Sequence, residues 1–310
     1  MFSELNHLLS DEERAAFSDV FSPELDAFIK SEKLNDDFKS SFISVYLPLA
    51  KWINNKHTEK SLIIGINGAQ GSGKSTLSKL LLRVLKTVFN KSVLHLSIDD
   101  LYLSQKKRLH LSNTIHPLLK VRGVPGTHDV ELGIKLLNEI NKSKNKKIKL
   151  PIFDKSIDDL LPQDDWLSIE NKIDIVLFEG WCVDAKAQSE SELKKPINIL
   201  EKKEDTDLCW RTYVNLQLSN QYKKLFSYID YLIMLQVPNM NSVFEWRSLQ
   251  ENKLQQREAE NSKTMSEEEI KKFIMYFERI TRHCLSEMPD RADVLLTLNK
   301  AHQVASVHLL

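Results

Sequence analysis

The segment from Gly68 to Ser75 has the residue types and the spacing of a phosphate-binding loop. It reads Gly-Ala-Gln-Gly-Ser-Gly-Lys-Ser and fits G-x-x-x-x-G-K-[ST] between a predicted strand and a predicted helix. Glycines let successive backbone N–H groups point at an anion, and the N-terminus of the following helix adds partial positive charge. In this arrangement Lys74 reaches the β- and γ-phosphates and the Ser75 hydroxyl ligates Mg²⁺. The predicted ligand is a nucleoside triphosphate, and its predicted contacts are Gly68, Ala69, Gln70, Gly71, Ser72, Gly73, Lys74, Ser75 and Thr76.

The alternative is an incidental glycine-rich turn between a strand and a helix. The chain has only eight glycines, and Gly65, Gly68, Gly71 and Gly73 are half of them. Glycine is needed where the backbone takes a positive φ or approaches a neighbour closely. This concentration therefore favours the phosphate-binding interpretation.

Acidic residues follow two further predicted strands. Asp99 and Asp100 come directly after one apolar stretch, and Glu179 ends another. Ligands of open α/β sheets bind beyond the carboxyl ends of the strands, and phosphoryl transfer to a hydroxyl needs a group that takes its proton. Asp99 is the predicted base, and helix capping by Asp99 and Asp100 is the alternative. Glu179 is predicted to hold Mg²⁺ with Ser75 or to assist the base, and with Lys74 these residues form the predicted catalytic set.

A second turn offers a mixture of polar side chains suited to a small acid. The segment from Arg122 to Asp129 reads Arg-Gly-Val-Pro-Gly-Thr-His-Asp. Its arginine suits a carboxylate and its other polar groups suit hydroxyls. For His128 the alternative is a solvated loop histidine. The predicted acceptor-binding residues are Asp99, Tyr102, Arg122, Thr127, His128 and Asp129.

Two basic residues are candidates for a phosphate clamp. Arg247 lies on a predicted helix just after the apolar stretch 231–237, where a guanidinium can bind phosphate oxygens as charge develops. A surface pairing with Glu251, four residues further on, is the alternative. Lys155 is likewise interpreted either as a ligand of phosphate oxygens or as a member of a surface ion pair.

Strands and helices alternate along most of the chain. Apolar runs typical of buried strands occupy 61–67, 92–97, 173–178, 228–237 and 294–298, and a short strand is expected at 148–152. Helical spacing of apolar residues occupies 75–89, 130–140, 207–226, 243–260, 266–285 and much of 11–56. This alternation predicts an α/β fold of the three-layer P-loop NTPase type, with a doubly wound, mostly parallel sheet over 59–310. A helical segment, 1–58, is expected to pack on it, and the strand order stays open.

Composition excludes several classes of partner. The 310 residues carry 43 basic and 43 acidic side chains, so no net field attracts nucleic acid or an anionic membrane. The longest apolar runs are strand-sized, and the N-terminus lacks the pattern of a secretory signal. Three cysteines without a CxxC pair are typical of free thiols in a reducing compartment. We expect a cytoplasmic protein whose partner is a small-molecule acceptor, with its oligomeric state undetermined.

Six short motifs follow one another at 67–76, 97–103, 122–129, 153–156, 177–181 and 245–251. The Arg-Gly-x-Pro-Gly-Thr-His-Asp and Phe-Glu-Gly-Trp elements are the most discriminating. In this order the motifs resemble the plant-type D-glycerate 3-kinase family and its bacterial and yeast relatives, which are grouped with phosphoribulokinase, uridine kinase and pantothenate kinase. The resemblance implies ATP and Mg²⁺ as cofactors and the phosphorylation of D-glycerate to 3-phosphoglycerate. It also implies Asp99 as the base and places the 122–129 turn near the acceptor.

Two segments depart from the pattern of that family. Residues 157–166 are acidic and lack arginine, where relatives often carry a glycine- and arginine-rich stretch. If that stretch closes over phosphates in relatives, other cations must serve here. Asp184 stands where relatives usually have glycine. The alternatives are therefore a nucleoside, pantothenate or a sugar phosphate as the acceptor, or a non-catalytic nucleotide-binding regulator.

Overall fold

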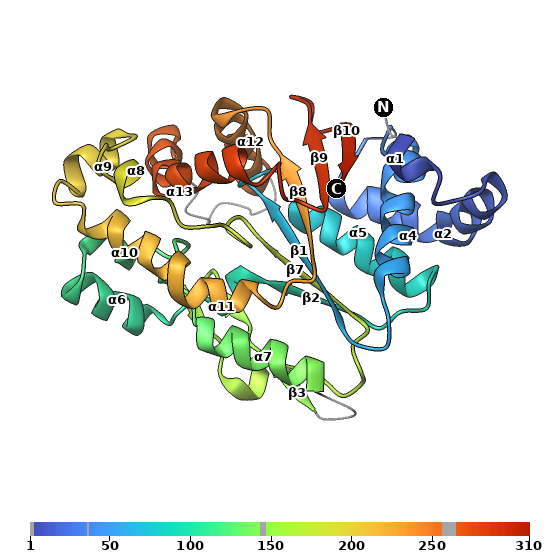
Figure 1. Ribbon diagram of the computed structural model, residues 1–310, viewed down its shortest axis with the longest axis horizontal. Coiled ribbons are helices and arrows are strands. Elements are labelled where there is room, and N and C mark those ends of the chain that lie inside the picture. The colour runs from blue at the N-terminus through green and yellow to red at the C-terminus, as the bar shows by residue number, and fades with distance from the viewer. Residues whose placement is uncertain (1–2, 36, 143–146, 256–264) are drawn as a thin grey trace.

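A six-stranded sheet forms the centre of the computed structural model, which describes residues 3–35, 37–142, 147–255 and 265–310 (Figure 1). The strand order is β10-β9-β8-β1-β7-β2. The strands are β1 (Leu62–Gly68), β2 (Val93–Ser97), β7 (Ile175–Gly180), β8 (Tyr231–Gln236), β9 (Val294–Leu298) and β10 (Val304–Leu309). All are parallel except β10, which pairs antiparallel with β9. The predicted mostly parallel α/β sheet is confirmed, and its order places β1 between β7 and β8.

Helices cover both faces of the sheet (Figure 1). One layer contains α2 (Asp11–Glu32), α4 (Leu47–Lys56) and α5 (Lys74–Thr87), and the other contains α7 (Val130–Lys142), α10 (Cys209–Gln217), α11 (Lys223–Phe226) and α13 (Glu267–Glu287). Side chains of β1 alternate between two buried clusters: Ile63 packs with the α7 and α13 layer, and Ile64 and Ile66 pack with the α5 layer. Because both faces are covered, the strand is apolar at every position from Leu62 to Ile66. Within the described ranges, no helix combines the length and the apolar character that crossing a bilayer requires.

The N-terminal helices pack on α5. Phe21 of α2 and Leu80 of α5 belong to the same buried cluster. At the end of α2, Glu32 accepts from Lys79 at 3.0 Å and from the Thr76 hydroxyl at 3.5 Å. The helix that follows the phosphate-binding loop is therefore braced from the N-terminal side.

Most predicted helices and strands are present with ends shifted by a few residues. The helix expected at 243–260 is α12 (Met240–Gln255), and residues 256–260 lie outside the described residues. The strand expected at 148–152 is β3 (Ile148–Leu150), which pairs with β6 (Leu167–Ile169) outside the main sheet. The shorter elements are α1 (Ser3–Asn6), α3 (Phe38–Ser41), η1 (Phe42–Tyr46), α8 (Glu190–Leu193), α9 (Ile199–Glu204), η3 (Pro117–Lys120), η4 (Gln163–Asp165) and η5 (Leu218–Tyr222).

Two of the longer elements, α6 and β10, were not predicted because their patterns are weak. The helix α6 (Gln105–Thr114) buries only Arg108, so it has no apolar stripe. In β10 the register shifts between Val304 and Ser306, which interrupts the alternation of a half-buried strand. Both elements depend on contacts with distant parts of the chain.

A small hairpin projects from the segment between α7 and β7. Its strands are β4 (Phe153–Asp154) and β5 (Asp159–Leu160), which pair antiparallel. The buried guanidinium of Arg108 holds it by donating to the Asp158 carbonyl oxygen at 2.7 Å. We refer to residues 153–160 as the 153–160 hairpin.

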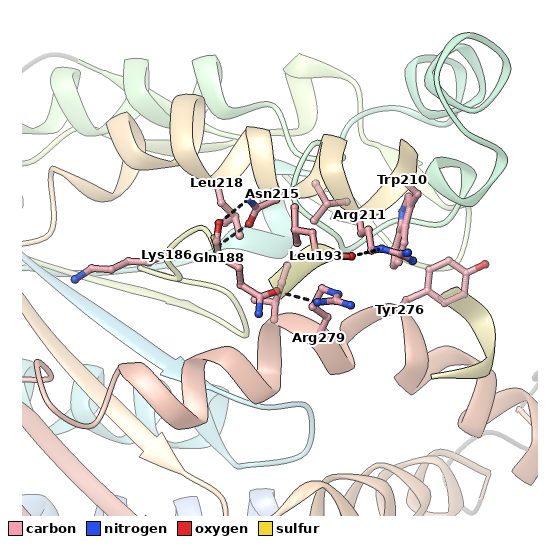
Figure 2. A pocket seen from close by; sticks show the side chains of 11 residues that line it. Lys186, Gln188, Leu193, Trp210, Arg211, Asn215, Leu218, Tyr276 and Arg279 are labelled. Atoms are coloured by element: carbon pink, nitrogen blue, oxygen red, sulfur yellow. Dashed lines mark hydrogen bonds between the residues drawn. The ribbon is translucent and has the colours of Figure 1, made fainter. Parts of the chain in front are cut away.

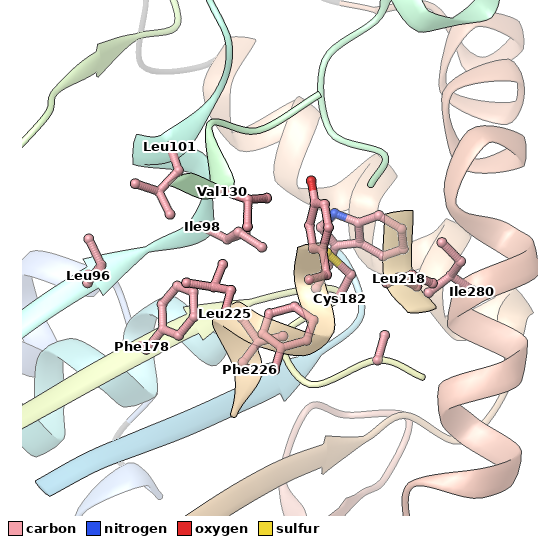
Figure 3. Close-up of a cluster of buried hydrophobic side chains, with 14 of the residues drawn as sticks. Leu96, Ile98, Leu101, Val130, Phe178, Cys182, Leu218, Leu225, Phe226 and Ile280 are labelled. Carbon is pink, nitrogen blue, oxygen red and sulfur yellow. The ribbon is translucent and has the colours of Figure 1, made fainter. Parts of the chain in front are cut away.

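The turn that carries Asp99 is anchored in the core. It forms η2 (Ile98–Leu101), and Figure 3 shows Ile98 and Leu101 among buried side chains of β7, α7 and α11. A Cβ on Gly133 of α7 would lie 2.8 Å from Leu101 Cδ1, so the missing side chain lets α7 approach η2 closely. Sequence alone offered no reason for this glycine.

Candidate active site

The phosphate-binding loop joins the central strand to the helix behind it. β1 ends at Gly68 and α5 begins at Lys74, as the motif requires. Gly71 has a φ of +77°, and a Cβ there would lie 2.9 Å from the Cβ of Trp246 on α12, so only glycine permits this packing. The buried loop residues are Gly68, Ala69 and Ser72, and the half-buried or exposed ones are Gln70, Gly71, Gly73, Lys74, Ser75 and Thr76.

Glu179 meets the end of this loop. Ser75 Oγ donates to Glu179 Oε1 at 2.9 Å, and Glu179 Oε2 is buried without a hydrogen-bond partner. Burial alone would raise the pKa of Glu179, but His95 and the charge of Lys74 lower it below its usual value. A buried, ionised carboxylate with one unpartnered oxygen beside a serine hydroxyl fits the oxygen ligands that Mg²⁺ prefers.

His95 is a site residue that the sequence did not indicate. Its Nε2 lies 3.7 Å from Glu179 Oε1. His95 is two residues before Ser97, which pairs with Glu179 in the parallel register of β2 and β7. Alternation along β2 puts His95 on the same face as Glu179, so knowledge of the strand order would have revealed the contact.

The Asp99 carboxylate lies between two donors. Tyr102 Oη donates to Oδ1 at 2.6 Å, and Lys155 Nζ donates to Oδ2 at 2.7 Å. Burial alone would raise the pKa of Asp99, but Lys155, Tyr102 and the charge of Lys74 lower it below its usual value. Since the side chain is 29% exposed, an ionised carboxylate faces solvent beyond the carboxyl end of β2.

The alternative role for Asp99 and Asp100 was capping of the following helix. In the structure the side chains of Asp100 and Ser97 cap the start of η2. Asp100 Oδ2 accepts from the Ser97 N–H at 3.2 Å, and Ser97 Oγ accepts from the Asp99 N–H at 3.2 Å. This reciprocal pair satisfies the start of η2. The Asp99 side chain is therefore not needed as a cap.

The 122–129 turn, which we predicted to present polar side chains to an acceptor, is largely buried. Thr127 Oγ1 donates to the Val124 carbonyl at 2.8 Å and accepts from the Gly123 N–H at 2.9 Å. The hydroxyl therefore closes the turn internally. In this arrangement the Thr127 hydroxyl hydrogen is already donated, so it is not available to the acceptor that we predicted it to bind.

His128 is also buried, so the solvated alternative does not describe it. Its ring stacks on Tyr102 with centroids 4.8 Å apart, and its Nδ1 lies 2.5 Å from Tyr222 Oη. Burial lowers the pKa of His128 to about 4, and the imidazole is therefore neutral near pH 7. The structure makes His128 a support beneath Tyr102.

The two ends of the turn are half-buried and carry charges that are paired. Arg122 pairs with Asp158 of the 153–160 hairpin, and its guanidinium carbon lies 5.5 Å from the centroid of Phe153. Asp129 accepts from Lys107 at 3.0 Å and from a backbone N–H in the first turn of α7 at 3.1 Å. Among the predicted acceptor residues of this turn, Arg122 is the one whose charged head lies over the Phe153 ring, on which Tyr102 packs.

Both clamp candidates are paired with carboxylates. Arg247 Nη1 lies 2.6 Å from Glu251 Oε2 in a nearly buried pair, and its guanidinium also lies over the Phe273 ring. Arg247 therefore pairs with Glu251 as in the alternative that we considered, but inside the protein and not on its surface. Lys155 contacts Asp99, as described above.

A cavity between α10 and α13 lies apart from this site (Figure 2). Figure 2 shows Arg211 bonded to the Leu193 carbonyl and Arg279 to Gln188 along its wall. Its enclosed volume is about 10 Å³, which is room for one water molecule. The cavity is therefore too small for a nucleotide or an organic acid.

One group of potential metal ligands also lies outside the site. Among the described residues, His116, Asp205 and Asp207 approach one another closely. However, His116 Nδ1 accepts from a backbone N–H, which leaves the proton on Nε2, and the Asp205 carboxylate accepts from Arg211. These groups are satisfied within the protein.

Comparison with known proteins identifies the family. The family model described as the KAP family P-loop domain matches residues 42–284. An uncharacterised kinase of Schizosaccharomyces pombe is 33% identical over 252 residues, which cover 78% of this chain and 84% of that protein. The chain belongs to the P-loop kinases. The predicted resemblance to this group is therefore confirmed.

Two further relatives of this P-loop kinase are D-glycerate 3-kinases. The chloroplastic enzyme of Arabidopsis thaliana is 28% identical over 261 residues, covering 78% of this chain and 54% of that protein. The solved structure of the Cryptococcus neoformans enzyme has a TM-score of 0.70 at 23% identity and covers 86% of this chain and 96% of that one. At 23% identity, the similarity to the Cryptococcus neoformans structure is a similarity of fold.

The backbone at position 184, where the resemblance implies glycine, has a conformation that favours glycine. In this kinase Asp184 has a φ of +57°, in the left-handed region that favours glycine. Arg291 donates to both the Asp184 carboxylate and its carbonyl oxygen. These contacts stabilise a conformation that glycine would adopt without help.

Proposed function

We propose that this kinase transfers the γ-phosphate of ATP to a hydroxyl of a small hydroxy acid, and that D-glycerate, giving 3-phosphoglycerate, is the acceptor. The observation that carries the proposal is the placement of Asp99 and Arg122 around one pair of aromatic rings. Asp99 is bonded to Tyr102, Tyr102 packs on Phe153 with centroids 5.1 Å apart, and Arg122 lies over Phe153. A base for a hydroxyl and a cation for a carboxylate thus contact the same pair of packed rings. The names of two relatives support the same acceptor.

In the proposed mechanism each charged group acts on one part of the reaction. Lys74 and the loop amides bind the phosphates and stabilise the charge that develops on the transferred group. Asp99 takes the proton of the acceptor hydroxyl as its oxygen attacks the γ-phosphorus. The bond from that phosphorus to the β-γ bridging oxygen breaks, and ADP leaves. Arg122 holds the acceptor carboxylate away from the phosphates.

Ser75 and Glu179 are proposed to hold Mg²⁺, which when bound supplies neutralising charge to the phosphates. Exchange of Glu179 for Gln keeps the shape and the bond from Ser75 but removes the negative charge. We expect the Mg²⁺ concentration for half-maximal turnover to rise by ~10–100-fold. A titration of turnover with Mg²⁺ measures this, and the exposed Glu190→Gln serves as control. An unchanged Mg²⁺ requirement in Glu179→Gln would exclude the assignment.

Lys155→Met should shift the acid limb of the pH profile. Asp99 must be ionised to accept a proton, and Lys155 helps to lower its pKa. Without Lys155 the burial of Asp99 raises that pKa, so the decline of kcat/KM at low pH should begin at a higher pH. Steady-state profiles of the variant, the wild type and Lys149→Met, a change on the neighbouring strand β3, measure the effect. A variant limb that coincides with the wild-type limb contradicts the proposed role of Asp99 as base.

A panel of acceptors tests the proposed function itself. ADP release with ATP and Mg²⁺ should depend on D-glycerate and stay near background with nucleosides, pantothenate, sugar phosphates and glycerol. Turnover with one of those others would keep the kinase chemistry and replace the acceptor. Absent turnover across the panel, with ATP binding intact, would favour a nucleotide-binding regulator.

We also propose that the protein acts in the cytoplasm, in keeping with its free cysteines.

A further inference from the structure

The 153–160 hairpin carries two opposite charges that both end on the proposed acceptor site. Lys155 Nζ lies 2.7 Å from Asp99 Oδ2, and the Asp158 carboxylate pairs with Arg122. Both residues lie in the turn that joins β4 to β5. Through this one turn Lys155 contacts the proposed base, and Asp158 contacts the cation proposed for the acceptor.

We propose that Asp158 is an internal anion that occupies the place of the acceptor carboxylate on Arg122, so that an acidic acceptor binds by exchange with Asp158. This inference rests on the proposed function and adds a residue that selects the acceptor. The chemical class it selects is a hydroxyl-bearing carboxylate.

The two arginines that hold Asp158 differ in how readily they can release it. Arg108 is buried and also donates to the carbonyls of Leu103 and Lys120, so its contact with Asp158 belongs to the framework. The Arg122 and Asp158 side chains are 31% and 32% exposed. Ion pairs at this exposure are weak because water competes for both partners. Exchange is therefore expected at Arg122 alone.

Selection follows from the charge balance of the exchange. An incoming carboxylate replaces one carboxylate on Arg122 by another, so the guanidinium stays paired. A neutral polyol leaves Arg122 without a partner once Asp158 is displaced, and a site that strands a charge rejects such a ligand. Asp158 thus discriminates against neutral acceptors of the same size.

Asp158→Asn tests the proposal with little change in shape. Asp158 has a φ of +56°, which asparagine tolerates, and the contact of its backbone carbonyl with Arg108 is retained. With the competitor removed, KM for D-glycerate should fall roughly five- to tenfold, since more of the protein is ready to bind. KM for ATP should stay within about twofold of wild type. An unchanged or increased KM for D-glycerate overturns the proposal.

Two further variants show whether the gain runs through Arg122. Asp165→Asn makes the same charge change at an exposed position nearby and should leave KM for D-glycerate unchanged. In Arg122→Gln/Asp158→Asn the gain from Asp158→Asn should disappear, because the two residues are coupled. A gain that persists without Arg122 contradicts exchange at that residue.

A readout without turnover separates this proposal from the proposed function. Trypsin cleavage after Lys155, followed by mass spectrometry, reports release of the hairpin. Acetate and D-glycerate should accelerate this cleavage in the wild type, glycerol should not, and Arg122→Gln should abolish the response. If the protein phosphorylates only a neutral acceptor, the proposed function fails, yet acceleration by acetate still supports exchange. Cleavage that is indifferent to acetate overturns the inference even if D-glycerate is phosphorylated.

Discussion

Asp99→Asn should lower kcat by about 10²–10⁴-fold while ATP binds as in the wild type. The amide oxygen can still accept from Tyr102 Oη, which now donates to Asp99 Oδ1 at 2.6 Å. It cannot take the proton of an acceptor hydroxyl. The loss should therefore appear in the chemical step. Single-turnover phosphoryl transfer and calorimetric titration with an unreactive ATP analogue measure the two quantities separately.

The neighbouring acid provides the matched control for this prediction. Asp100 accepts from the Ser97 N–H, and asparagine caps a turn as well as aspartate does. Asp100→Asn should retain turnover within a few-fold of wild type. Turnover by Asp99→Asn near the wild-type rate would remove Asp99 as the base, and equal losses in both variants would point to η2 as a structural unit instead.

Lys74→Met should lower kcat/KM for ATP by about 10²–10³-fold, because a preorganised charge facing the transferred phosphate is lost. Methionine keeps much of the length and the apolar character of the lysine stem. The loss of charge has a second effect, because Lys74 also lowers the pKa of both Asp99 and Glu179. The acid limb of the activity profile should consequently move to higher pH in this variant. Steady-state kinetics across pH measure both effects.

Lys79→Met is the control on the same helix. Lys79 lies in α5, and its ammonium pairs with Glu32 at 3.0 Å on the side of the N-terminal helices. Its substitution should leave kcat/KM for ATP unchanged. If Lys74→Met retains more than about one tenth of wild-type kcat/KM, the phosphate-binding role of the loop lysine is wrong.

Local patterns were sufficient to predict the nucleotide side of the site. The motif from Gly68 to Ser75 is contiguous, and its function follows from its own backbone and from the strand and helix that flank it. Asp99 and Glu179 follow strands, and the carboxyl ends of parallel strands meet at one edge of a sheet. Their proximity to the loop therefore required the fold class and little else.

On the acceptor side of the site, local sequence patterns did not predict which side chains are buried. Residue types in the 122–129 turn indicated polar contacts with a ligand, but the packing of Tyr102, Tyr222 and the surrounding helices buries Thr127 and His128. Hydrophilic character did not predict exposure here, because Thr127 forms its hydrogen bonds within the turn and His128 contacts Tyr222 from a distant helical segment. Of the predicted acceptor residues in this turn, Arg122 keeps its charged head over the Phe153 ring.

By itself the sequence determined the phosphate-binding loop, the alternation of strands and helices and the acids at the strand ends, because each depends on neighbours within a few residues. The tertiary structure alone decided the contact of His95 with Glu179, the burial of His128 and the two charges that the 153–160 hairpin brings to Asp99 and Arg122. The physical reason is the separation of the partners along the chain. Lys155 and Asp99 are 56 residues apart and Arg122 and Asp158 are 36 apart, so their pairing follows from strand order and packing.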